Sequence, residues 1–182
     1  MLRLLTAAWL GLCLVLTPLG AHAALKPGDP APDFTTEAAL AGEPFKFELK
    51  EALKQGPVVL FFYPKAFTSG CTLEAHLFAE ATPQFQALDA RVIGLSHDDI
   101  DTLKRFSIEA CRKQFAVASD PQAKVIRAYD AKLMLVPDMA DRISYLVTPD
   151  GRIAAVHAAM DPRGHVQAML KAVEQWKKAN QR

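Results

Sequence analysis

Cysteine is scarce in this chain of 182 residues, which contains only Cys13, Cys71 and Cys111. No two of them form a C-x-x-C pair, which weakens the case for a thiol-disulfide oxidoreductase of the thioredoxin type. The two cysteines beyond residue 23 are too few for a disulfide scaffold. We therefore expect cysteine to carry chemistry rather than to cross-link the chain.

A strong charge bias is also missing, because 21 Lys and Arg face 20 Asp and Glu. Without a basic stretch or a charged block, the sequence excludes electrostatic binding to nucleic acid and a charged tail for membrane surfaces. The histidines beyond residue 23 show no metal-ligand spacing, and we expect neither a metal nor a cofactor.

The chain has one long apolar run, residues 4–19, which follows Arg3 and precedes the small-x-small sequence Ala21-His22-Ala23. This order predicts a signal peptide over residues 1–23 that is cleaved after Ala23, and hence a periplasmic or secreted protein. A retained membrane anchor is the alternative, although the run is short for a span of about 20 residues.

Residues 24–182 form the mature chain, and their length predicts one domain with a substantial core. Arg3 is the only charge lost with the leader, so 20 basic residues face 20 acidic ones. We expect no contact of the mature chain with a membrane.

The most informative stretch joins an apolar strand to a helix. Residues 58–63 are unbroken apolar and aromatic, as in a strand buried on both faces, and Pro64 ends it. Thr68 and the two residues after it are typical of a helix start, which places Cys71 in the first helical turn. Unpaired N–H groups there favour a thiolate and make Cys71 a candidate nucleophile.

The remaining pattern predicts a thioredoxin-like α/β fold, with a central mixed sheet flanked by helices. Strands at 58–63 and 92–95 around a helix form a parallel βαβ unit, and strands at 143–147 and 152–156 form a hairpin before a final helix from Asp161. The other expected elements are a proline-rich lead-in at 25–34, strands at 45–49 and 115–118, helices at 51–55, 100–111 and 121–129, and an irregular segment at 133–140.

A thiolate that reacts with a peroxide needs donors that polarise the O–O bond and stabilise the departing oxygen. Thr68 can place a hydroxyl beside Cys71, and Arg142 is a candidate cation because it begins the hairpin strand expected near residues 58–63. A solvent-exposed charge at a strand end is the alternative for Arg142.

These residues resemble a known family. Pro64-x-x-x-Thr68-x-x-Cys71 matches the active-site signature of the peroxiredoxins, and residues 62–65 (FYPK) and 70–75 (GCTLEA) resemble the PrxQ branch, also called bacterioferritin-comigratory proteins. The resemblance extends over the mature chain, from residues 28–34 to the strand that begins at Arg142.

The resemblance implies a thiol peroxidase that reduces hydrogen peroxide and organic hydroperoxides. Cys71 would attack the peroxide and become a sulfenic acid, Thr68 and Arg142 would position and polarise it, and Pro64 would shield the sulfur. A thioredoxin-like protein or a small thiol would be the reductant, and the protein would be a monomer. Glu74 would support the site; an exposed acid in the first helical turn is the alternative.

One departure concerns the second thiol. Many PrxQ-like proteins carry a resolving cysteine five residues after the first, where this chain has His76. Cys111 is then either the resolving cysteine or a buried inert thiol, and both readings stay open. Two other functions remain as alternatives: a thioredoxin-fold thiol-disulfide oxidoreductase, and a periplasmic metallochaperone that uses Cys71, Cys111 and a histidine.

Overall fold

A computed structural model describes residues 24–180 of the chain. The predicted signal peptide, residues 1–23, lies outside the described residues, so its cleavage stays a prediction. In chain order, the elements are β1 (Thr35–Leu40), β2 (Glu43–Glu48), α1 (Leu49–Leu53), β3 (Val58–Phe62), α2 (Ser69–Ala87), β4 (Arg91–Ser96), α3 (Ile100–Glu109), β5 (Ala116–Ser119), α4 (Lys124–Ala128), β6 (Lys132–Leu133), β7 (Val136–Ala140), β8 (Ile143–Val147), β9 (Ile153–Ala158) and α5 (Arg163–Asn180).

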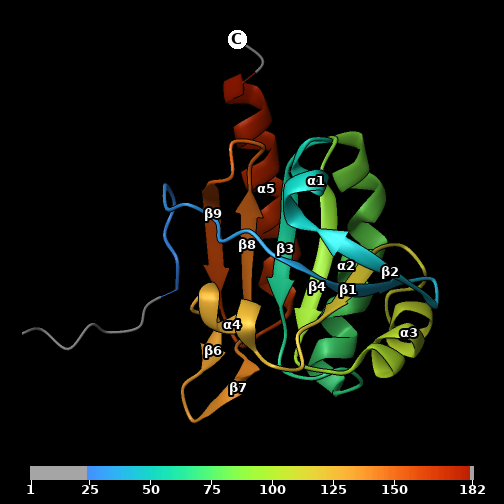
Figure 1. Cartoon of the computed structure of the whole chain (residues 1–182). Helices are drawn as coiled ribbons and strands as arrows, with labels where there is room; N and C mark the ends of the chain where they lie inside the picture. The colour runs from blue at the N-terminus through green and yellow to red at the C-terminus, as the bar shows by residue number, and fades with distance from the viewer. Residues whose placement is uncertain (1–23, 181–182) are drawn as a thin grey trace, which may run out of the picture.

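Seven strands form the main sheet, in the order β2-β1-β5-β4-β3-β8-β9. β3 pairs in parallel with β4, and β4 with β5, whereas β8 runs antiparallel to β3. α2 and α5 pack together on one face of this sheet, and α1 and α4 cover the other (Figure 1). The predicted mixed sheet flanked by helices is confirmed.

The position of β3 inside the sheet explains why its sequence is apolar without interruption. Val59 and Phe61 point into the core shared with α2, α3 and α5, whereas Val58, Leu60 and Phe62 point into the core shared with α1 and α4. Both faces of the strand are buried, so no position can be polar.

Three expectations about secondary structure are wrong. Residues 133–140 are not irregular, because β6 and β7 pair as a two-stranded sheet. β1 was not expected at all; the Glu and the two Ala of its sequence TTEAAL are weak strand formers, but it pairs along its whole length with β2. α3 ends at Glu109, so Cys111 lies beyond the helix instead of at its last residue.

The predicted hairpin of β8 and β9 is confirmed. Asp99 is the N-cap residue of α3 and accepts a hydrogen bond from the Thr102 N–H at 2.8 Å, whereas the neighbouring Asp98 is buried. Within residues 24–180, no helix is both long and apolar enough to cross a bilayer.

Candidate active site

Cys71 lies in the first turn of α2, directly after the loop that leaves β3. The N-cap residue Thr68 has an extended backbone, with φ −72° and ψ 152°, and its carbonyl accepts from the Thr72 N–H at 2.9 Å. Thr68 is exposed, and its hydroxyl donates to the Lys65 carbonyl at 3.0 Å. The Cys71 side chain is buried, so the thiol faces the protein from a helix N-terminus.

Asp98 anchors the loop between β3 and α2. Its Oδ2 accepts from the Ala66 N–H and from the Ser96 hydroxyl, both at 2.8 Å. Phe67 has a left-handed backbone, with φ 64°, and its ring packs edge-on against Phe106. A non-glycine residue keeps this backbone conformation only where the surrounding structure enforces it. The packing around Phe67 therefore fixes the conformation of the loop.

Arg142 reaches Cys71 because of the register between two strands. β8 pairs antiparallel with β3, with Ile143 opposite Phe62, so Arg142 lies at the end of β3 from which the loop to Cys71 departs. The Arg142 Nη2 is 3.5 Å from the Cys71 Sγ, and Nε donates to the Met160 carbonyl at 3.0 Å. Arg142 is buried, which rules out the solvent-exposed alternative.

Glu74, one helical turn after Cys71, is the second partner of this guanidinium. The Arg142 Nη1 donates to Glu74 Oε2, and the Glu74 side chain is completely buried. Burial raises the pKa of Glu74 to about 8, against the opposing effect of Arg142. Although burial disfavours the charge of Arg142, Glu74 and Cys71 raise the pKa of the guanidinium above its usual value. The exposed-acid alternative for Glu74 is wrong.

His165 belongs to the same cluster but was not among the predicted site residues. It lies in the first turn of α5, is fully buried, and places Nδ1 3.6 Å from Glu74 Oε1. Burial lowers its pKa to about 4. The sequence did hold a signal, because His165 adjoins the apolar stripe of α5 that contains Val166 and Met169, where a histidine is buried.

Cys111, the second candidate thiol, is completely buried just after α3. It shares one apolar cluster with Cys71, and both are free thiols. Burial raises the pKa of Cys111 well above its usual range, so this thiol is protonated in the folded chain. Arg112 and Lys113 follow it with φ of 49° and 61°. Pro64, the remaining candidate, is half-buried at the end of β3.

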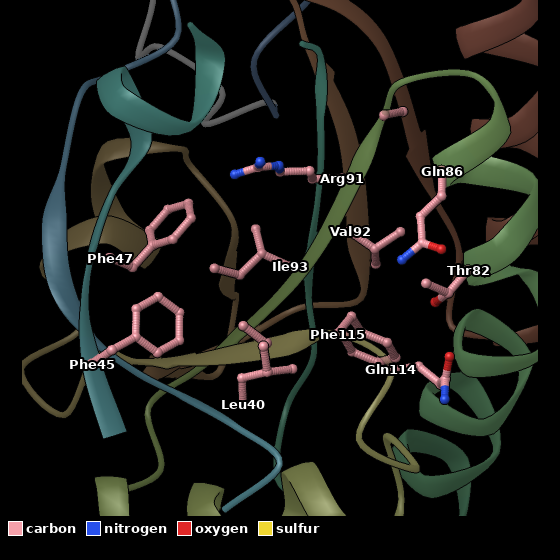
Figure 2. A pocket seen from close by; sticks show the side chains of 12 residues that line it. Leu40, Phe45, Phe47, Thr82, Gln86, Arg91, Val92, Ile93, Gln114 and Phe115 are labelled. Carbon is pink, nitrogen blue, oxygen red and sulfur yellow. The ribbon is translucent and has the colours of Figure 1, made fainter. Parts of the chain in front are cut away.

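An apolar pocket of the molecule lies away from these residues. Phe45, Phe47 and Ile93 line it, together with Arg91 at the start of β4 (Figure 2). Cys71 instead follows the end of β3, the neighbouring parallel strand, and does not line this pocket. The pocket is therefore not part of the thiol site.

The fold and the thiol define a class of protein, an α/β domain with a buried cysteine beside an arginine at a helix start. The AhpC/TSA family model matches residues 27–156. Among curated proteins, the putative peroxiredoxin YkuU of Bacillus subtilis is 35% identical over 135 residues, 69% of this chain and 74% of that protein. The putative peroxiredoxin bcp of Helicobacter pylori (strain J99) is 30% identical over 154 residues, 82% of this chain and 98% of that protein.

Solved structures agree with these relatives. The peroxidoxin BcpB of Mycobacterium tuberculosis superposes with a TM-score of 0.71 at 30% identity, over 83% of this chain and 97% of that one. A cysteine-to-serine mutant of PrxQ from Xylella fastidiosa gives 0.74 at 24% identity, over 85% and 98% of the two chains, which supports the fold. The chain belongs to the AhpC/TSA family and, within it, to the peroxiredoxins, which are thiol-dependent peroxidases.

Proposed function

We propose that Cys71 is the residue that reduces hydrogen peroxide and organic hydroperoxides. The observation that carries this proposal is the guanidinium of Arg142, which lies 3.5 Å from the Cys71 Sγ through Nη2 while Glu74 holds its Nη1. A fixed cation and a helix N-terminus both stabilise negative charge, first on the sulfur and then on the departing oxygen.

The reaction proceeds by attack of the thiolate on the terminal peroxide oxygen. The S–O bond forms as the O–O bond breaks, sulfur is oxidised to a sulfenic acid, and the peroxide is reduced to hydroxide or alkoxide, which takes up a proton to become water or an alcohol. Arg142 and the N–H groups of the first turn stabilise the leaving oxygen. Thr68 accepts a hydrogen bond from the peroxide, and Pro64 limits access of water to the sulfur.

The sulfenic acid is then reduced by a thiol, and Cys111 is one candidate. It shares the apolar cluster of Cys71, but its thiol is buried and protonated, so the segment after α3 must open first. Strain at Arg112 and Lys113, whose φ values are positive, favours such opening. The other candidate is an outside reductant, a thioredoxin-like protein or a small thiol, with Cys111 inert.

The setting of the reaction is also a proposal. Residues 1–23 have the pattern of a signal peptide, which supports a periplasmic or secreted enzyme. We further propose that the mature protein acts as a monomer.

Two other functions remain to be separated from peroxidase chemistry. A thiol-disulfide oxidoreductase would need a paired thiol close to Cys71, and residue 74 is a glutamate. A metallochaperone would need ligands that converge, but among residues 24–180 no group of three His, Cys, Asp or Glu side chains is placed to hold an ion. Copper binding without peroxide reduction would favour the chaperone.

Stopped-flow oxidation by hydrogen peroxide tests the proposal on the parent, Cys71→Ser and Cys111→Ser proteins, with mass analysis of each product. The parent and Cys111→Ser should react, Cys71→Ser should not, and Cys111→Ser should accumulate a sulfenic acid that dimedone traps. A Cys71→Ser variant as active as the parent contradicts the peroxidase assignment. A parent product without a Cys71–Cys111 disulfide assigns reduction to an outside thiol.

A further inference from the structure

The segment that joins β9 to α5 binds Arg142 through its backbone. The Met160 carbonyl accepts from the Arg142 Nε at 3.0 Å, and the Ala159 N–H donates to the Arg142 carbonyl at 3.3 Å. The Met160 side chain is 60% exposed, so it does not anchor the segment in the core. Another group must therefore fix the position of these two residues.

His165, in the first turn of α5, holds this segment. Its Nε2 lies 2.8 Å from the Ala159 carbonyl oxygen, which can only accept, so Nε2 carries the hydrogen. Its Nδ1 lies 2.8 Å from the Ser144 Oγ and accepts from that hydroxyl. Since this bond uses the single lone pair of Nδ1, the Glu74 Oε1, 3.6 Å away, is not a partner of the ring. The buried ring is therefore neutral and bonded on both sides.

These contacts form a closed circuit that begins and ends on one strand. Ser144 lies two residues after Arg142, and all five residues of β8 are buried. From the Ser144 hydroxyl, the hydrogen bonds lead through His165 to the Ala159 carbonyl. The next carbonyl, that of Met160, returns to the Arg142 side chain. The segment is therefore placed relative to the strand that follows Arg142, and not only relative to α5.

The direction of the Arg142 guanidinium depends on this circuit. A planar guanidinium needs two fixed contacts to set its direction, because a single contact leaves it free to pivot. Glu74 holds Nη1 and the Met160 carbonyl holds Nε, and together they direct Nη2 to the Cys71 Sγ at 3.5 Å. A shift of the Met160 carbonyl would therefore move Nη2 relative to the sulfur.

We propose that His165 is a positioning residue that aims Arg142 at Cys71. It acts through the backbone of Ala159 and Met160 and needs no contact with the peroxide. The proposal rests on the peroxidase function proposed above for Cys71. The alternative is a purely structural role, in which the buried ring only fastens α5 to β8. The two roles differ in what a change of His165 does to the guanidinium.

Two amide variants separate these roles, because they differ in reach. The amide nitrogen of His165→Gln can take the place of Nε2 and donate to the Ala159 carbonyl, whereas the shorter His165→Asn can occupy only the place of Nδ1 beside Ser144. The rate constant with hydrogen peroxide should fall about tenfold in His165→Asn, since part of the hydrogen bond that directs Arg142 is lost. In His165→Gln it should stay within about threefold of the parent.

Val166→Ala is the matched control for stability. Val166 is the next residue of α5, is 6% exposed and packs in the apolar core, so its truncation lowers the midpoint of thermal unfolding without removing a hydrogen bond. Its rate constant should equal that of the parent. Rate constants that follow the unfolding midpoint across the three variants refute the positioning role, and so does a His165→Asn rate equal to that of His165→Gln.

The Nε–H signal of Arg142 in an NMR spectrum tests the contact without peroxide. This signal is assigned by its absence from Arg142→Lys. In the parent, Val166→Ala and His165→Gln it should exchange slowly with solvent, because the Met160 carbonyl accepts from it. In His165→Asn the exchange should be about tenfold faster. Exchange that is equally slow in His165→Asn, or fast in the parent, overturns the proposal.

The positioning role and the peroxidase function can fail separately. A parent whose Arg142 signal behaves as described, but that does not react with hydrogen peroxide, overturns the peroxidase assignment and leaves the placement of Arg142 by His165 standing. A parent that reacts, with equal rate constants in the two amide variants, overturns the positioning role alone.

Discussion

Gly70 offers a test of the Arg142 contact that removes no polar group from the site. A Cβ added at Gly70 would lie 3.1 Å from the Arg142 Nη2, which is the nitrogen beside the Cys71 Sγ. Gly70 lies in the first turn of α2, where alanine is favoured over glycine by up to about 1 kcal/mol. Gly70→Ala should therefore keep or raise stability while it moves the guanidinium.

The size of the effect follows from how tightly Arg142 is held. Glu74 and the Met160 carbonyl bind its other nitrogens, so the nitrogen that must yield to the added Cβ is Nη2, the one beside Cys71. A hydrogen bond to a charged group contributes about 1.5–3 kcal/mol, and losing part of it costs about 1–2 kcal/mol. The rate constant with hydrogen peroxide should then fall about 5- to 30-fold.

Stopped-flow kinetics and thermal unfolding together check this expectation. Ser69→Ala is the matched control, because Ser69 lies in the same turn and its side chain is exposed. It should leave the rate unchanged. A Gly70→Ala rate within twofold of the control, with a folded protein, would refute the importance of the Nη2 contact.

Three further predictions concern neighbouring groups. Arg142→Lys keeps the charge, but an ammonium lacks the planar, forked donors of a guanidinium and cannot reach three partners at once. Stopped-flow should therefore show a loss of about 100-fold in the rate constant, and a loss below tenfold contradicts this role of the guanidinium. Asp98→Ala leaves the Ala66 N–H and the Ser96 hydroxyl without their acceptor, which should lower the free energy of unfolding by about 2–3 kcal/mol in urea titrations, whereas Asp98→Asn should recover part of it. The folded chain binds the Glu74 proton more tightly than the unfolded chain, so this group lowers stability as pH rises toward about 8. The lowered pKa of His165 has the opposite effect, but only up to the pKa of an unfolded histidine, about 6.5. Thermal unfolding should therefore show stability falling from about pH 6.5 to 8, and a flat profile contradicts a buried Glu74 with a raised pKa.

Much of the fold could be predicted because its strongest signals are local. The apolar run of β3, the turn between β8 and β9, and the stripe of α5 each depend on residues close in sequence. β1 could not be predicted this way, since its strand exists through pairing with β2 and β5 and not through its own residues. The pair of β6 and β7 is likewise too short for a clear alternation.

The site residues also differ in whether the neighbouring sequence is enough to predict them. The signature around Cys71 places a thiol at a helix start, and neighbouring residues are enough to predict that. The pKa of Glu74 is different, because it depends on burial and on Arg142, 68 positions later in the chain. No spacing along α2 contains that information. Sequence patterns can locate the candidate nucleophile, but only the packing of α2 against α5 and β8 determines the environment of its neighbouring groups.

The two cysteines show why packing also limits how the enzyme completes its cycle. Cys71 and Cys111 belong to one buried apolar cluster, which also contains Tyr63 just after β3. Burial keeps Cys111 protonated and therefore a poor nucleophile. We therefore expect direct resolution by Cys111 to need an opening of the strained turn at Arg112 and Lys113. If that turn opens, amide hydrogen exchange of residues 110–114 should speed up after peroxide treatment in the parent and stay slow in Cys71→Ser; equal exchange in both would assign reduction to an outside thiol.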